Sequence, residues 1–87
     1  MASAPKTLAA ILSGRADANL RFAGLRRILL LFGFSERTTG GHHIFSRTGV
    51  EEIVNLQPLP GGKAKPYQVK QVRQLIIRHA LTLPGKE

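Results

Sequence analysis

The chain has 87 residues, of which thirteen are lysine or arginine and five are aspartate or glutamate, so its formal net charge is +8 at pH 7. A chain of this length forms one domain and buries only somewhat more than about 60% of the surface that its unfolded form exposes, which excludes deep pockets. It has no cysteine, which excludes disulfides, thiolate zinc sites and thiol nucleophiles and makes a reducing cytoplasm the expected location.

The first predicted element is a short N-terminal helix. Apolar residues run from Leu8 to Leu12 and Ser13-Gly14 follows them, so we expect a helix over residues 6–12 that ends at the glycine. Asp17 to Asn19 then offers polar side chains of the kind that cap a helix start. We divide the chain into an N-terminal extension (1–19), a domain (20–83) and a tail (84–87).

A second helix is predicted from Leu20. Its apolar residues recur at the spacing of one helical face, at Leu25, Ile28, Leu29 and Phe32. Gly33 follows as the C-terminal cap. Leu30 and Leu31 widen the apolar surface, so we expect this end of the helix to be largely covered.

Three extended segments follow, at about residues 36–39, 42–47 and 50–57. Gly40-Gly41 and Thr48-Gly49 separate them, as is typical of hairpins. Alternation places His42 and Ile44 on one face of the middle strand, with His43 and Phe45 on the other. One of these faces must pack on the helices, led by Phe45 or Ile44.

A third helix is predicted from Pro66, because proline suits the first turn of a helix. Its buried stripe is expected to hold Val69, Val72, Ile76 and Ala80. Leu83-Pro84-Gly85 should end it. The predicted fold is therefore α+β: a three-stranded antiparallel sheet with two helices on one face and a short extra helix before them. This α-β-β-β-α order is that of the double-stranded-RNA-binding fold.

The positive charge is concentrated in the last third of the chain. No acidic residue lies between Ile53 and Lys86, where the basic residues are Lys63, Lys65, Lys70, Arg73, Arg78 and Lys86. One-sided clustering favours a polyanionic partner over the alternative that the charge only keeps the protein soluble. The longest apolar run, Ile28 to Phe32, is too short to cross a membrane, and we expect no membrane association.

Two of the three histidines, His42 and His43, stand at the start of the middle strand. RNA cleavage by its own 2′-hydroxyl needs a base for the hydroxyl proton, an acid for the leaving 5′-oxygen and cations for the charge that develops on phosphorus. Imidazole suits the first two roles and lysine or arginine the third. Neighbouring strand residues point to opposite faces, so these two histidines cannot act together on one phosphate. A metal site is disfavoured because these two side chains diverge and because His79, the third histidine, lies far away on the last helix.

Four segments carry a resemblance to a known family. They are Leu29-Leu30-Leu31-Phe32-Gly33-Phe34, Gly40-Gly41-His42-His43-Ile44-Phe45, Asn55-Leu56-Gln57-Pro58, and Ala64 through Arg73. In this order and spacing, over about residues 20 to 81, the chain resembles the HicA toxins of type II toxin–antitoxin systems. The family usually has Gly-Ser-His at the active strand, whereas Gly41 precedes His42 here.

The resemblance implies a metal-independent, cofactor-free ribonuclease that cleaves mRNA and is held inactive by a HicB-like antitoxin. It assigns the catalytic role to His42 and leaves the second acid–base group open. The residues expected to contact RNA are Gly41, His43, Lys63, Lys65, Lys70 and Arg73.

Two other functions remain open from the residues. The same basic helix could serve a non-catalytic RNA-binding module, or the basic face could dock an acidic protein. Tyr67 and Phe45 stand at positions typical of the core rather than of a base-stacking platform. Glu51 and Glu52, the one acidic pair, are expected to be simply solvated.

Overall fold

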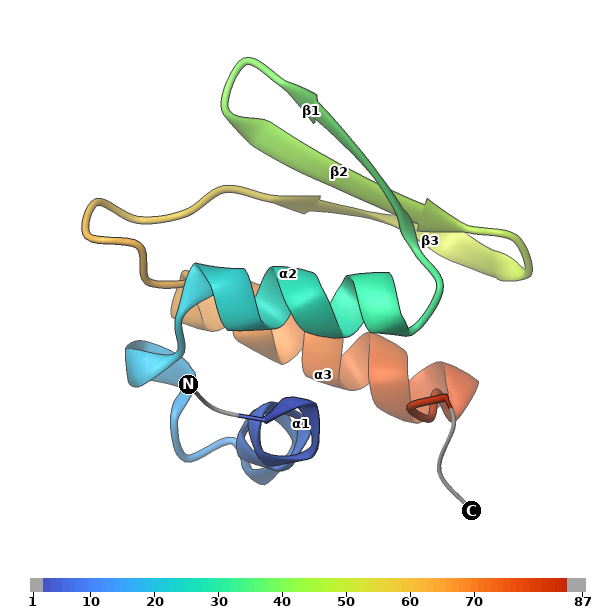
Figure 1. Cartoon of the computed structure of the whole chain (residues 1–87), viewed down its shortest axis with the longest axis horizontal. Helices are drawn as coiled ribbons and strands as arrows, with labels where there is room; N and C mark the ends of the chain where they lie inside the picture. Colours follow the sequence, from blue (N-terminus) through green and yellow to red (C-terminus); the bar gives the residue numbers. More distant parts are fainter. Residues whose placement is uncertain (1–2, 85–87) are drawn as a thin grey trace.

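The structure, a computed structural model, describes residues 3–84. Within that range it is an α+β fold of three α-helices and three antiparallel strands. The elements are α1 (Ala4–Ser13), a 3-10 helix η1 (Asp17–Asn19), α2 (Phe22–Leu31), β1 (Ser35–Thr39), β2 (His42–Arg47), β3 (Val50–Leu56) and α3 (Pro66–His79). The strand order is β1-β2-β3. The sheet lies over α2 and α3, and α1 packs on these helices on the side away from the sheet (Figure 1).

Helix α1 confirms the predicted N-terminal helix and is longer at both ends. The Ser3 hydroxyl accepts a hydrogen bond from the Lys6 amide at 3.3 Å, and Pro5 stands in the first turn. Gly14 ends the helix with φ +73°, a left-handed conformation that glycine adopts without strain. Ile11, from the predicted extension, is fully buried in the core. The extension and the domain therefore share one hydrophobic core.

The predicted cap at Asp17 to Asn19 is wrong. These residues form η1, and α2 begins only at Phe22, where Arg21 caps the helix without a side-chain hydrogen bond. The Asp17 carboxylate cannot cap a helix because it is bound to Arg73 of α3.

Helix α2 buries the predicted stripe and ends at Leu31, with Phe32 as its C-cap; Gly33, the predicted cap, follows one residue later with φ +93°. Leu25, Ile28 and Leu29 are fully buried, and the Phe34 amide donates to the Leu29 carbonyl across Gly33 at 3.1 Å. Leu30 does not extend this buried surface as predicted: it is 36% exposed, because it lies on the side of α2 away from the core.

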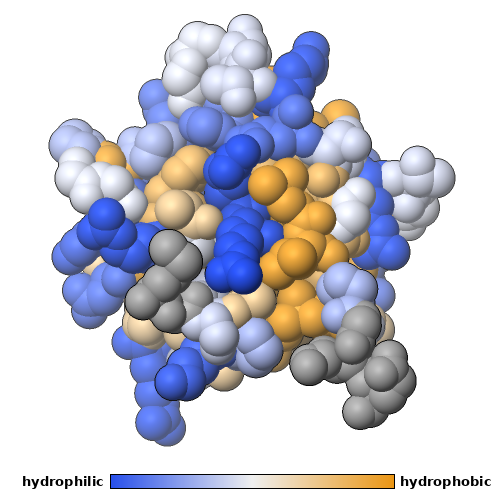
Figure 2. Space-filling view, in the orientation of Figure 1, coloured by the Kyte–Doolittle hydropathy of each residue, from blue (hydrophilic) through white to orange (hydrophobic). Residues whose placement is uncertain are grey.

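A groove of about 760 Å³ lies between α1 and α2. Small and apolar side chains line it together with the basic residues Lys6, Arg21, Arg26 and Arg27. The view in Figure 2 shows hydrophobic surface over the helices beside a strongly hydrophilic ridge. The two helices lie close together at Gly24, where an added Cβ would lie 3.3 Å from the Thr7 methyl group.

The sheet confirms the predicted alternation, and Phe45 leads its inner face. Phe45 pairs with Val54 of β3, and both are fully buried against the helices. No helix of the described residues lies on the opposite, outer face of the sheet (Figure 1). His42, Ile44, Ile53 and Asn55 lie on this outer face, and Ile53 is 64% exposed.

Helix α3 begins at Pro66 as predicted and buries Val69, Val72 and Ile76. Ala80 does not complete the stripe: it is exposed and caps the helix with φ +50°, so α3 ends at His79 rather than at Leu83-Pro84-Gly85. Gly85 and the rest of the predicted tail after Pro84 lie outside the described residues. Between residues 3 and 84, no helix has the length and apolar character needed to cross a membrane.

Candidate functional site

The candidate site starts at the turn between β1 and β2. Gly40 and Gly41 have φ values of +57° and +85°, and a Cβ at either position would meet no atom within 4 Å. Glycine is favoured at both positions by backbone conformation and not by lack of space. A serine at position 41 would have to adopt a conformation that is strained for residues with a Cβ. The turn conformation therefore explains why glycine stands at this position.

His42 is the first residue of β2, and its exposed imidazole lies on the outer face of the sheet. Its Nδ1 is 3.1 Å from Oδ1 of Asn55, on the neighbouring strand β3. The ring is therefore held at one nitrogen and open to solvent, as a group that exchanges protons with a bound ligand must be.

His43 points to the opposite face, as predicted, and it is partly buried against α2. Its side chain is 22% exposed, its Nδ1 is 2.7 Å from a carboxylate oxygen of Glu36, and its ring packs edge-on against Phe22 at 4.8 Å. Glu36 also binds Arg26, and hydrogen bonds from Arg26 and then His43 lower the pKa of its carboxyl. His43 thus joins β2 to α2, and its predicted contact with RNA stays a prediction.

A chain of hydrogen bonds links the His42 strand pair to the start of α3. The Gln68 side chain donates to the backbone carbonyl of Asn55 at 3.3 Å and accepts from the backbone N–H of Gln57 at 3.2 Å. The Gln57 side chain in turn accepts from Nζ of Lys65 at 3.3 Å. Gln68 is only 5% exposed, so its two hydrogen bonds fix the end of β3 against α3 in a setting where an unpaired amide would be costly.

Sequence reasoning missed this role of Asn55, Gln57 and Gln68. One signal was available: Gln68 directly precedes Val69 and stands four residues before Val72, so it shares the buried side of α3. A polar side chain at such a position must have hydrogen-bond partners.

The predicted lysines gather around the start of α3. The loop before the helix is attached to the start of α2, where Ala64 N donates to Leu20 O at 2.8 Å and Phe22 N donates to Gly62 O at 2.9 Å. The backbone bridge between Arg21 and Lys63 places these two residues side by side. Arg21 is therefore a basic residue of the site that the sequence pattern did not indicate, because it lies in a different third of the chain.

Exposed residues of α3 extend this basic surface. Lys70 is exposed, and Tyr67 three residues before it is 65% exposed. The expectation that Tyr67 belongs to the core is wrong, because the buried side of α3 passes through Gln68 and Val69 instead. We refer to Arg21, Lys63, Lys65 and Lys70 as the basic cluster.

Arg73 stands apart from the basic cluster. Its guanidinium forms a bidentate ion pair with Asp17, with N–O distances of 3.0 and 3.1 Å, and donates to the Ile11 carbonyl at 3.0 Å. The Arg73 side chain is 17% exposed. It attaches the N-terminal segment to α3, which is a structural role; its predicted contact with RNA stays a prediction.

The prediction that Glu52 is simply solvated is wrong. It forms an ion pair with Arg78 and a hydrogen bond with Nε2 of His79 at 2.8 Å near the end of α3. Hydrogen bonds from Arg78 and then His79 lower the pKa of Glu52 to about 2. This contact joins β3 to α3 at the end of the helix opposite to the basic cluster.

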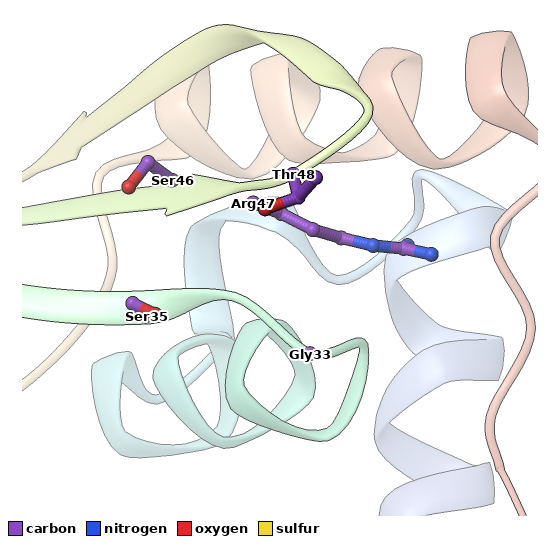
Figure 3. Close-up of a pocket in the computed structure, with 5 residues that line it drawn as sticks. All are labelled: Gly33, Ser35, Ser46, Arg47 and Thr48. Carbon is purple, nitrogen blue, oxygen red and sulfur yellow. The ribbon is translucent and has the colours of Figure 1, made fainter.

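A second surface feature lies at the other end of β2 from His42. Gly33, Ser35, Ser46, Arg47 and Thr48 line a shallow pocket of about 560 Å³. Figure 3 shows Ser35 and Ser46 on neighbouring strands and the long Arg47 side chain extending away from them. None of the predicted site residues lines this pocket. Across residues 3–84, no group of three His, Asp or Glu side chains is close enough to hold a metal ion.

The chain was compared with known protein families, with characterised proteins and with solved structures, and it matches none of them.

Proposed function

We propose that the protein is an mRNA-cleaving endoribonuclease with a double-stranded-RNA-binding-like fold. The observation that carries the proposal is the exposed His42 imidazole, which Asn55 holds at one nitrogen and which hydrogen bonds through Gln68 and Gln57 link to Lys65 in the basic cluster. A proton-transfer group and a phosphate-binding surface thus belong to one connected region.

In the proposed reaction, the 2′-hydroxyl of RNA attacks the adjacent phosphorus and the 5′-oxygen of the next nucleotide leaves. His42 takes the hydroxyl proton, a contribution of roughly a hundredfold to ten-thousandfold. The basic cluster binds the phosphates and stabilises the negative charge that builds up on them. The leaving 5′-oxygen takes a proton from water, so the products are a 2′,3′-cyclic phosphate and a free 5′-hydroxyl. This chemistry needs neither a metal ion nor a cofactor.

As the resemblance to HicA toxins implies, we further propose that the enzyme is the toxin of a cytoplasmic toxin–antitoxin pair. A HicB-like antitoxin would block it by covering His42. Such an antitoxin would have to cover the outer face of the sheet, where His42, Asn55 and the 64% exposed Ile53 lie together and which no helix of residues 3–84 covers.

The test is cleavage of a single-stranded mRNA by purified wild-type and His42→Ala proteins, with and without a chelator. The wild type should cleave in both conditions and leave cyclic phosphate ends. His42→Ala should keep its melting temperature, because His42 is exposed, and should lose at least about a hundredfold in rate. His79→Ala is the matched control, since His79 pairs with Glu52 away from the site, and it should cleave like the wild type.

Full cleavage by a folded His42→Ala protein would refute the catalytic assignment. If the wild type binds RNA in a salt-sensitive manner but cleaves none, the protein is instead a non-catalytic RNA-binding module. That alternative uses the basic cluster alone and needs no imidazole.

A further inference from the structure

We propose that Asn55 is a positioning residue that holds neutral His42 in the tautomer with its proton on Nδ1, so that the lone pair of Nε2 faces the substrate. This inference rests on the proposed function for its catalytic consequence. Its structural part, the control of one imidazole by one amide, can be measured without RNA.

The strand register brings these two side chains together. Ile44 pairs with Asn55 and His43 pairs with Leu56, so Asn55 is the diagonal neighbour of His42 on the outer face of the sheet. The contact between His42 Nδ1 and Asn55 Oδ1 is 3.1 Å long. Both side chains are exposed, and hence the contact directs a ring that could otherwise rotate freely.

The chemistry of the amide oxygen decides which ring nitrogen carries the proton. An amide oxygen only accepts hydrogen bonds, and a neutral imidazole has one donor and one acceptor nitrogen. With Nδ1 donating to Asn55, Nε2 is left as the acceptor. Nε2 has no hydrogen-bond partner in the part of the chain that the structure describes. It is therefore free to accept the proton of a 2′-hydroxyl, as a general base must.

The hydrogen bonds behind Asn55 make it a rigid support. The buried Gln68 side chain holds the backbone on both sides of Leu56, through the Asn55 carbonyl and the Gln57 amide. Leu56 itself is fully buried. The Asn55 backbone is thus fixed to α3, and a group held by a second layer of hydrogen bonds orients its partner more accurately than a free surface side chain does.

The experiment compares four proteins: wild type, Asn55→Ala, Asn55→Asp and the control Ser46→Ala. Ser46 is exposed on the outer face of the same strand as His42. The tautomer of His42 is read from long-range nitrogen–proton NMR correlations of the RNA-free protein at about pH 8, where imidazole is neutral. Cleavage of a single-stranded mRNA is measured in parallel, and melting temperatures verify that each variant is folded.

The wild type and Ser46→Ala should show the Nδ1–H tautomer and equal cleavage. Asn55→Ala should shift His42 towards the Nε2–H tautomer and lose about ten- to a hundredfold in cleavage rate, as for other residues that orient a reacting group. Asn55→Asp keeps an oxygen acceptor, so it should keep the Nδ1–H tautomer and cleave faster than Asn55→Ala.

The proposal is overturned if the wild type shows the Nε2–H tautomer, which would mean that the Asn55 amide presents its NH₂ group to the ring. It is also overturned if Asn55→Ala keeps the wild-type tautomer or the wild-type cleavage rate. A wild type that cleaves no RNA refutes the proposed function separately, and the tautomer comparison still decides whether Asn55 positions His42.

Discussion

At the scale of single residues, the role of a basic side chain depends on whether it is already bound to a carboxylate. Arg73 and Lys70 stand three positions apart on α3, yet Arg73 is bound to Asp17 while Lys70 is exposed. The first holds the fold together and the second is free to meet a phosphate. The same distinction separates His43, bound to Glu36, from His42 on the outer face.

Replacing Arg73 should therefore affect stability more than RNA binding. Arg73→Ala removes the pair with Asp17 and the hydrogen bond to the Ile11 carbonyl, and it leaves a carboxylate that is only 21% exposed without a partner. We expect a loss of about 2–4 kcal/mol in the free energy of unfolding, measured by urea denaturation.

Lys70→Ala is the control for this prediction because it removes an exposed cation from the same helix. Its stability should stay within about 0.5 kcal/mol of the wild type, while its RNA affinity falls. A stability of Arg73→Ala equal to that of Lys70→Ala would contradict the structural role of Arg73.

At the scale of elements, α1 belongs to the core of the domain. Ile11 is fully buried, whereas its neighbour Leu12 is 44% exposed. The helix approaches α2 at Gly24 and is attached to α3 through Arg73. An N-terminal extension that only decorated the surface would have no buried side chain of this kind.

The pair Ile11→Ala and Leu12→Ala tests this conclusion with nearly the same loss of side-chain atoms on one helix. Ile11→Ala opens a cavity in the core and should destabilise the protein by about 2–5 kcal/mol. Leu12→Ala should cost less than about 1 kcal/mol, because half-exposed leucine loses little burial. Thermal melting followed by circular dichroism checks both, and equal melting temperatures would mean that α1 does not contribute to the core.

At the scale of the whole molecule, two polar connections attach the sheet to α3. The first, through Gln68, lies beside the candidate site, and the second, through Glu52, lies at the far end of the helix. Only the second is ionisable. Because the pKa of Glu52 is lowered from 4.5 to about 2 in the folded protein, its stabilising effect is complete above about pH 4.5 and is lost as the pH falls towards 2.

Glu52→Gln should therefore be less stable than the wild type at pH 6, and the difference should disappear on acidification to about pH 2. Urea unfolding midpoints at the two pH values measure it. Glu51→Gln, an exposed neighbour, is the control and should follow the wild type at both. A difference between wild type and Glu52→Gln that persists at pH 2 would show that the Glu52 ion pairs do not cause it.

The order and type of the elements could be predicted because they depend on short-range properties of the chain. Left-handed backbone is needed after two helices, at Gly14 and Gly33, and in the β1–β2 turn, at Gly40-Gly41. Pro66 starts α3. Alternation along β2 predicted that His42 and His43 diverge and that either Phe45 or Ile44 faces the helices; the structure buries Phe45. The expected start of the second helix and end of the third were less accurate: Asp17 is bound to the distant Arg73, and Ala80 ends α3 in a left-handed conformation that is unusual for a residue other than glycine.

The amino-acid pattern was enough to predict the α+β order, the separation of the two histidines and the strong positive charge. Which polar groups are exposed and which are paired depends on how the chain folds. Asp17 and Arg73 are 56 positions apart, and Glu52 and His79 are 27 apart; Arg21 meets Lys63 across the fold, and Asn55 meets His42 across a strand pair. Hydrogen bonds and ion pairs form between groups that the folded chain brings within about 3 Å, and no pattern along the sequence encodes that distance.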